Sequence, residues 1–145
     1  MKRLLAAFCV TLVACGLAIA HDAETNESHD GEQVKVIAQH LLGEKLDGKE
    51  AAASVVEVRI APGQEGHAHR HPGPVIVYVI EGTYELGIDD KPTEIFKAGE
   101  SFYEPSDCLH RVSRNPSKTE PTKLVAVVLH PREAKEVAIP EPQEK

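Results

Sequence analysis

Positive charge is scarce in this sequence. The 145 residues contain 16 Lys and Arg against 23 Asp and Glu, which gives a formal net charge of −7 at pH 7. Affinity for nucleic acids comes mainly from basic side chains that neutralise phosphates, so this balance argues against a nucleic-acid partner. It also gives an anionic membrane surface no reason to attract the protein.

Long apolar runs are lacking outside the N-terminus. There, Lys2 and Arg3 precede an apolar stretch that ends in the small-x-small triplet Ala18-Ile19-Ala20. The pattern predicts a secretory signal peptide over residues 1–20, cleaved after Ala20, and hence a periplasmic or secreted protein. The stretch falls short of the ~20 residues that a spanning helix needs, so we expect no membrane insertion of the mature domain. The alternative processing route is lipidation of Cys15, because residues 12–15 resemble a lipoprotein box.

Cysteine is nearly absent from the mature chain. Of the three cysteines, Cys9 and Cys15 lie in the predicted leader, so only Cys108 remains and no internal disulfide can form. A lone cysteine is usually a buried, small apolar residue, which is our interpretation of Cys108. Its position two residues before His110 leaves a functional role open.

Heptads, internal repeats and convincing helical periodicity are also missing. Short runs of β-formers alternate instead with Gly, Pro, Asn and Asp turn signals, which is typical of an antiparallel sandwich or barrel. The only helical alternative, His40 to Ala52, is weakened by Gly43 and Gly48. The predicted strands are Val34–Ala38, Ala53–Ala61, Val75–Glu81, Thr83–Ile88, Thr93–Lys97, Ser101–Glu104, His110–Ser113 and Lys123–Leu129.

We therefore expect one all-β domain over residues 33–131. Residues 21–32 are polar and acidic and predict a flexible segment, and the charged, Pro-rich residues 132–145 predict a flexible C-terminal tail. The strands 75–80 and 124–129 are apolar at successive positions, which predicts cover on both faces.

Histidines carry the clearest chemical signal. His67, His69 and His71 alternate along the chain, and side chains two apart in an extended segment share a face, with Cα atoms roughly 6.6 Å apart. Two neighbours of this set can hold one ion, and a further ligand is available at His110. Clustered histidines at ligand spacing predict a metal site.

These stretches resemble the two sequence motifs of the cupin family, small antiparallel β-barrels that commonly hold one metal ion. The first motif reads Gly, five residues, His-x-His, three or four residues, Glu, six residues, Gly. The second reads Gly, five residues, Pro-x-Gly, two residues, His, three residues, Asn. The resemblance covers about residues 55–129, and the matching residues are Gly63, His69, His71, Gly82, Gly99, Pro105 and His110.

The sequence departs from these motifs in three places. Val75 occupies the position of the first-motif Glu, Asp107 replaces the second-motif Gly, and Arg114 stands where the Asn is expected, with Asn115 one residue later. The resemblance therefore implies a metal centre of His69, His71 and His110 without the usual carboxylate, with His67 as an additional or supporting ligand. Such a set is similar to the three-His centres of some dioxygenases in the family. The ion would be one divalent transition metal, Fe, Mn, Ni, Cu or Zn, since imidazole suits them all.

Two tyrosines are candidate catalytic residues. Tyr78 lies in the strand that carries Val75, and Tyr103 lies among the residues before His110, so either phenol could donate a proton to a bound molecule. Packing is the alternative role for both. Glu104, Cys108 and Arg111 also flank the third predicted ligand, and Glu104 is the other candidate base.

The functional expectation is thus a metal-binding protein with a small-molecule ligand or substrate. A dioxygenase-like oxidoreductase is the first hypothesis, and a non-catalytic periplasmic module that binds a metal or a small ligand is the alternative, because fold does not fix function. Membership of the family would also imply a homodimer, which would cover edge strands.

Overall fold

A computed structural model of the chain describes residues 26–29 and 31–142, and within this part all regular structure is β-strand. The predicted signal peptide lies outside the described residues. No helix within the described part is both long and apolar enough to span a bilayer. The strands are β1 (Asn26–His29), β2 (Glu32–Leu46), β3 (Lys49–Ile60), β4 (His69–Arg70), β5 (Val75–Glu81), β6 (Thr83–Ile88), β7 (Glu94–Lys97), β8 (Ser101–Glu104), β9 (His110–Arg114), β10 (Thr122–Pro131) and β11 (Ile139–Pro140).

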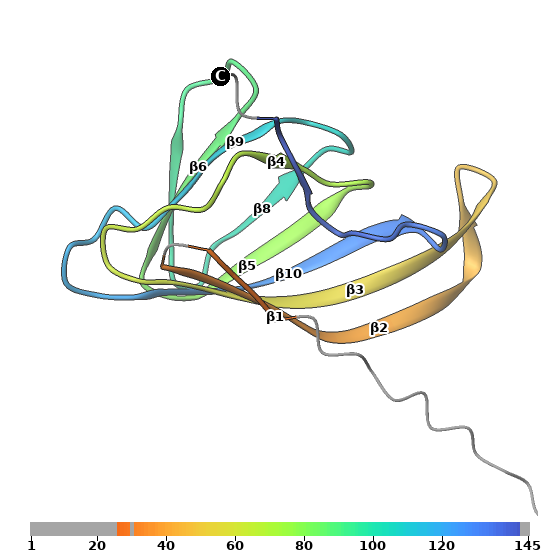
Figure 1. The fold of residues 1–145 in the computed structure, drawn as a ribbon, viewed down its shortest axis with the longest axis horizontal. Coiled ribbons are helices and arrows are strands. Elements are labelled where there is room, and N and C mark those ends of the chain that lie inside the picture. The colour runs from red at the N-terminus through yellow and green to blue at the C-terminus, as the bar shows by residue number, and fades with distance from the viewer. Residues whose placement is uncertain (1–25, 30, 143–145) are drawn as a thin grey trace, which may run out of the picture.

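The strands form two antiparallel sheets that face each other. The larger sheet has the order β1-β2-β3-β10-β5-β8 and the smaller one β11-β4-β9-β6-β7 (Figure 1). This arrangement confirms the predicted all-β, antiparallel class. The two sheets remain separate sheets and do not close into one hydrogen-bonded barrel.

Alternation along the strands places the core between the sheets. In β5, Val75, Val77 and Val79 are buried while the intervening side chains are exposed. In β10, Leu124, Ala126 and Val128 are buried and the intervening side chains are half-buried. The expectation that β5 is covered on both faces is therefore wrong. Its even-numbered residues face outward, because no further layer packs on the larger sheet within the described residues.

The weak helical alternative at residues 40–52 is also excluded, because β2 and β3 form a long hairpin there. The chain reverses at Asp47 and Gly48, which have φ angles of 50° and 75°. Asp and Gly tolerate this left-handed conformation, so the turn explains Gly48, whereas Gly43 lies within β2.

Both segments predicted to be flexible contribute strands. Residues 26–29 of the acidic segment pair with β2, and residues 139–140 of the C-terminal tail pair with β4. After β10 the chain turns back across the molecule to reach β4, as the dark blue segment of Figure 1 shows. The C-terminal segment is thus placed beside the short strand that carries the first histidine motif.

Candidate metal centre

The three histidines predicted as ligands converge between the sheets. His69 lies in β4, His71 follows that strand, and His110 opens β9 directly opposite His69 in the β-ladder. One ring nitrogen from each of the three lies within 4.8 Å of the others. The spacing in the sequence places two of these side chains together, and strand pairing supplies the third.

The rings of His69 and His71 point unprotonated nitrogens at each other. His69 Nδ1 donates a hydrogen bond to the His67 carbonyl (2.8 Å), and His71 Nδ1 donates one to the Val137 carbonyl (2.6 Å). Because a neutral imidazole carries one N–H, the Nε2 atom of each ring bears a lone pair. These two Nε2 atoms lie 3.2 Å apart, a distance at which a shared cation would bind both.

Burial keeps these rings neutral. It lowers the pKa of His69, and it lowers that of His71 to about 4 with a further contribution from the charge of His69. The pKa of His110 is lowered well below its ordinary value, first by burial and then by the two neighbouring rings. Neutral imidazole is the form that ligates metals.

A chain of hydrogen bonds fixes the orientation of His110. Ser113 Oγ donates to the Glu32 carboxylate (3.2 Å), and Tyr84 OH donates to Ser113 Oγ (3.0 Å). With its proton so used, the Tyr84 oxygen accepts from His110 Nε2 at 3.0 Å. His110 Nδ1 therefore carries the lone pair, and this buried atom has no hydrogen-bond partner.

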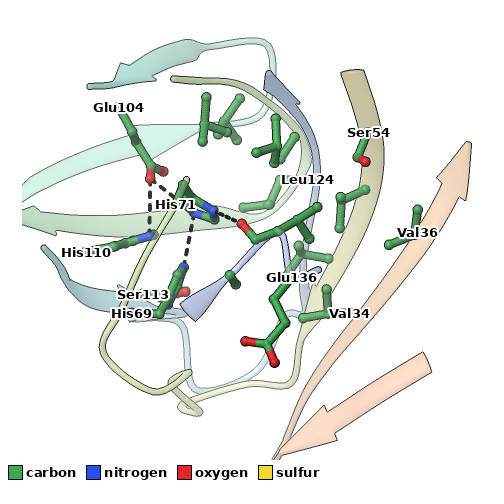
Figure 2. Close-up of a pocket in the computed structure, with 18 of the residues that line it drawn as sticks. Val34, Val36, Ser54, His69, His71, Glu104, His110, Ser113, Leu124 and Glu136 are labelled. Atoms are coloured by element: carbon green, nitrogen blue, oxygen red, sulfur yellow. Dashed lines mark hydrogen bonds and ion pairs between the residues drawn. The ribbon is translucent and has the colours of Figure 1, made fainter. Parts of the chain in front are cut away.

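Glu104 brings a carboxylate to the same place. Its Oε2 atom lies 3.5 Å from His71 Nε2 and 3.4 Å from His110 Nδ1, and the residue is 1% exposed. This oxygen likewise lacks a hydrogen-bond partner, and burial raises the pKa of the carboxyl to about 7. Figure 2 shows Glu104, His69, His71 and His110 pointing toward one another.

These donors fit a transition metal ion. Unpartnered buried polar atoms are rare in proteins and call for an explanation, and both such side-chain atoms of the described residues belong to this cluster. Nitrogen and oxygen donors at converging positions are the ligands that Fe, Mn, Ni, Cu and Zn accept. The cluster thus has the ligand atoms of a metal site, and two of these atoms have no hydrogen-bond partner.

A cavity of about 570 Å³ adjoins the cluster. Its walls are mostly aliphatic, and Figure 2 shows Val34, Val36 and Ser54 across the cavity from the histidines. Ser54 Oγ is held by His130 Nε2 at 2.9 Å and by Gln39 Nε2 at 3.2 Å. The cavity is large enough for a small organic molecule that reaches from the histidines to this polar group.

The C-terminal segment forms one wall of the cavity. Residues 134–138, 140 and 141 line it, and the Val137 carbonyl holds His71. Glu141 anchors the segment, since its carboxylate pairs with Arg70 Nε (3.0 Å) and its N–H donates to the Ala68 carbonyl (2.9 Å). The tail expected to be flexible is thus part of the site, and its contact with His71 is a backbone carbonyl that leaves no signal in the sequence.

Other predicted residues lie elsewhere. Tyr78 and Tyr103 are 51% and 59% exposed on the outer face of the larger sheet, and neither lines the cavity. Tyr78 points outward because it lies an odd number of residues from Val75, whose side chain is buried. His67 lines the cavity, and it contacts His69 through its carbonyl group; its ring is not in the three-histidine cluster.

Cys108 and Arg111, the other predicted neighbours of His110, make contacts that indicate structural roles. Cys108 is buried, and burial followed by the charge of Glu104 raises the pKa of its thiol, which fits packing better than reactivity. The exposed Arg111 guanidinium donates to the backbone carbonyls of Asp89 and Lys91.

Comparison with known proteins agrees with this geometry. The model of the cupin domain matches residues 56–128, which is half of the chain. This protein belongs to the cupin family. No curated protein sequence matches it.

Solved structures of cupin-like folds superimpose on most of the chain. A conserved protein of Klebsiella pneumoniae with a double-stranded β-helix domain aligns with a TM-score of 0.58 at 22% identity, covering 79% of this chain and 90% of that one. The polyketide cyclase RemF from Streptomyces resistomycificus has a TM-score of 0.59 at 16% identity, with 85% and 83% covered. Oxalate decarboxylase from Bacillus subtilis has a TM-score of 0.59 at 19% identity, covering 81% of this chain but 30% of its own. At these identities the similarity shows the fold.

The structure explains two departures from the cupin motifs. Asp107, at the glycine position, has a φ angle of 58°, a conformation that Asp tolerates better than most residues. Asn115 is fully buried, and its amide donates to the carbonyls of Ile60, Ala61 and Glu120. Arg114, at the motif position itself, forms an ion pair with Glu85. The hydrogen bonds of Asn115 instead connect the loop after β9 to the end of β3.

Proposed function

We propose that this protein binds one divalent transition metal ion at His69, His71 and His110 and acts on a small molecule in the adjoining cavity. The observation that carries the proposal is the set of unprotonated ring nitrogens that converge beside a mostly aliphatic cavity of about 570 Å³. When bound, a redox-active ion would supply Lewis acidity and, as Fe(II), the capacity to use dioxygen.

The residues of this chain define the substrate's general shape. Valine side chains from β2, β3 and β5 line the cavity and suit an apolar body. The cluster at one end suits an oxygen-bearing polar head, and Ser54 and Gln39 offer hydrogen bonds across the cavity. This supports a dioxygenase-like oxidoreductase for molecules with an apolar body. The signal-peptide pattern supports a periplasmic location for this activity.

A non-catalytic binding module is the second candidate. The observation in its favour is that both tyrosines expected as proton donors are on the outer face, away from the cavity. The fold neighbours do not decide between the two candidates, because one fold supports many functions.

Metal content is the first test of the proposal. The protein, purified without a histidine tag or chelator, is expected to carry near one equivalent of a transition metal. His69→Ala and His110→Ala should lose it, while His40→Ala, an exposed histidine of β2, should retain it. Wild-type protein that takes up no Fe, Mn, Ni, Cu or Zn after reloading would contradict the metal centre.

Oxygen consumption distinguishes the enzyme from the binding module. The metal-loaded protein is mixed with panels of thiols, diketones and phenolic acids in an oxygen electrode. Uptake that disappears in His110→Ala supports the oxidoreductase. Tight binding of panel compounds without oxygen uptake supports the binding module.

A further inference from the structure

Strand register places Glu104 beside the position at which the cupin motif has its carboxylate. That position is Val75 in β5, and the residue directly opposite it in β8 is Glu104. Side chains of directly opposed residues project from the same face with Cβ atoms about 4.5–5.5 Å apart. Val75 and Glu104 are each 1% exposed, so both face the interior. A carboxylate on Glu104 can thus occupy the space that one at position 75 would fill.

The Glu104 carboxylate points at ligand atoms of the cluster. Oε2 is 3.5 Å from His71 Nε2 and 3.4 Å from His110 Nδ1, the nitrogens whose lone pairs face the centre. It has no hydrogen-bond partner, although it is buried. The two atoms left unsatisfied in the described part of the chain, Glu104 Oε2 and His110 Nδ1, therefore face each other.

A hydrogen bond donated by the histidines to Glu104 does not account for this geometry. His71 already donates through Nδ1 to Val137, and His110 donates through Nε2 to Tyr84. Neither neutral ring has a proton left on the nitrogen that faces Glu104. A proton on the Glu104 carboxyl could serve only one of the two nitrogens, and neither Glu104 Oε2 nor His110 Nδ1 has a hydrogen-bond partner. Lone pairs of two rings and one carboxyl group therefore converge, and a shared cation would bind all of them.

We propose that Glu104 is the fourth protein ligand of the metal, so that the carboxylate of the centre comes from β8 instead of β5. This inference rests on the proposed metal-binding function. It replaces the carboxylate-free set of three histidines expected from the sequence with three nitrogens and one oxygen. The carboxylate offsets one of the two positive charges of a divalent ion, which reduces the attraction of the site for anionic substrates.

Cobalt(II) binding tests the assignment without any activity assay, because its visible absorption reports on the ligands. Glu104→Gln keeps the shape of the side chain and removes its charge. We expect it to weaken Co(II) binding by more than about 100-fold, beyond the 10–100-fold that loss of an outer-sphere partner costs, and to change the Co(II) spectrum. Glu94→Gln, on the exposed strand β7, is the matched control and should leave both unchanged.

A cross-strand exchange sharpens the test. The double variant Val75→Glu/Glu104→Val moves the carboxylate to the other side of the same residue pair. It should recover Co(II) affinity to within about tenfold of wild type, an expectation set by the close spacing of opposed side chains. An exchange variant that melts cooperatively but binds no better than Glu104→Gln would overturn the assignment.

The outcomes separate this inference from the proposed function. Wild-type protein that binds no Co(II) or other transition metal overturns both. Wild-type protein that binds Co(II), together with a Glu104→Gln variant of equal affinity and identical spectrum, overturns the role of Glu104 alone and leaves the three-histidine centre in place.

Discussion

The two sides of the metal centre are held by different means. His69 and His71 lie on and beside β4, a strand of two residues, and their Nδ1 atoms are fixed by backbone carbonyls. His110 belongs to the interior of the smaller sheet, is 3% exposed, and is fixed by a chain of side chains through Tyr84 and Ser113. One side depends on the end of the chain, and the other depends on the core.

This difference affects how each side can fail. β4 pairs with β11 over two positions and with β9 over one. Because few hydrogen bonds hold this strand, we expect it to open locally more easily than the core strands. β9 is paired over several positions with β6 and opens only with the core. We therefore expect the His69 and His71 side to respond to changes at the C-terminus, and the His110 side to respond to changes in the core.

Glu104 contacts histidines on both sides of the centre. The largest expected effect is its contribution to the pH dependence of the free energy of unfolding. Burial raises its pKa from 4.5 to about 7 in the folded, metal-free protein. A raised pKa stabilises the fold below pH 4.5, and this stability is lost as the pH rises through 7. Each unit of pKa difference corresponds to about 1.4 kcal/mol, so Glu104→Gln should gain about 3 kcal/mol relative to wild type between pH 4.5 and 8.

Chemical denaturation in the presence of EDTA measures this difference. The histidines are present in both proteins, so their opposite titration, which destabilises the fold as the pH falls, largely cancels in the comparison. Parallel pH profiles for the two proteins would show that Glu104 is not buried as a carboxylate.

Removing the C-terminal segment tests the dependence of the first side on the chain end. A chain that ends at Pro131 lacks the Val137 carbonyl and the Arg70–Glu141 ion pair. Loss of such an outer partner weakens metal binding by about 10–100-fold, so we expect Co(II) affinity to fall in that range. The matched control is a chain that ends at Pro142, which retains all of these contacts.

Val137 also packs against the core, so thermal melting should accompany the affinity measurement. Glu141→Gln provides a milder test, because it weakens the anchor and keeps the segment. Equal Co(II) affinity in both truncated chains would refute a role for the segment in holding His71.

Tyr84→Phe tests the second side. The substitution keeps the stacking of this ring on Phe102, whose centroid is 5.4 Å away, and removes the hydroxyl that accepts from His110. Metal binding should weaken by about tenfold, the lower end for outer partners. Tyr78→Phe makes the same chemical change on the outer face and should leave Co(II) affinity unaltered. If the two variants behave alike, the hydrogen-bond chain does not position His110.

The smallest effect is expected for the exposed tyrosines. Tyr78→Phe and Tyr103→Phe remove hydroxyls that lie on the outer face of the larger sheet. Metal content and any oxygen uptake should stay within about twofold of wild type, as for most surface substitutions. A variant that retains the metal and loses oxygen uptake would restore that tyrosine as a catalytic candidate.

Much of the fold was predictable from local patterns. Short runs of β-forming residues and the turn residues between them led to an all-β antiparallel fold, which the structure confirms. The His69 and His71 pair was predictable because side chains two apart in an extended chain share a face. The hairpin of β2 and β3 was missed, because Gly43 and Gly48 obscured a pattern that pairing with a neighbour completes.

The residues that support the three histidines were harder to predict from the sequence. Glu104 stood out in the sequence only as a possible base, and Tyr84, Ser113 and Glu32 did not stand out at all. Each of these residues reaches the centre from a different strand, so no local spacing relates them. Val137 contributes a backbone carbonyl, which any residue carries.

The sequence alone determined the fold class and the three histidines, because strand alternation, turn chemistry and two motifs are properties of short segments. Tertiary structure decided which nitrogen of each ring faces the centre, where the carboxylate comes from and what forms the cavity wall. Those features depend on the register between strands distant in sequence, such as Val75 with Glu104 and His69 with His110. Register is set by how the strands pair and pack across the whole sandwich, and no single segment contains that information.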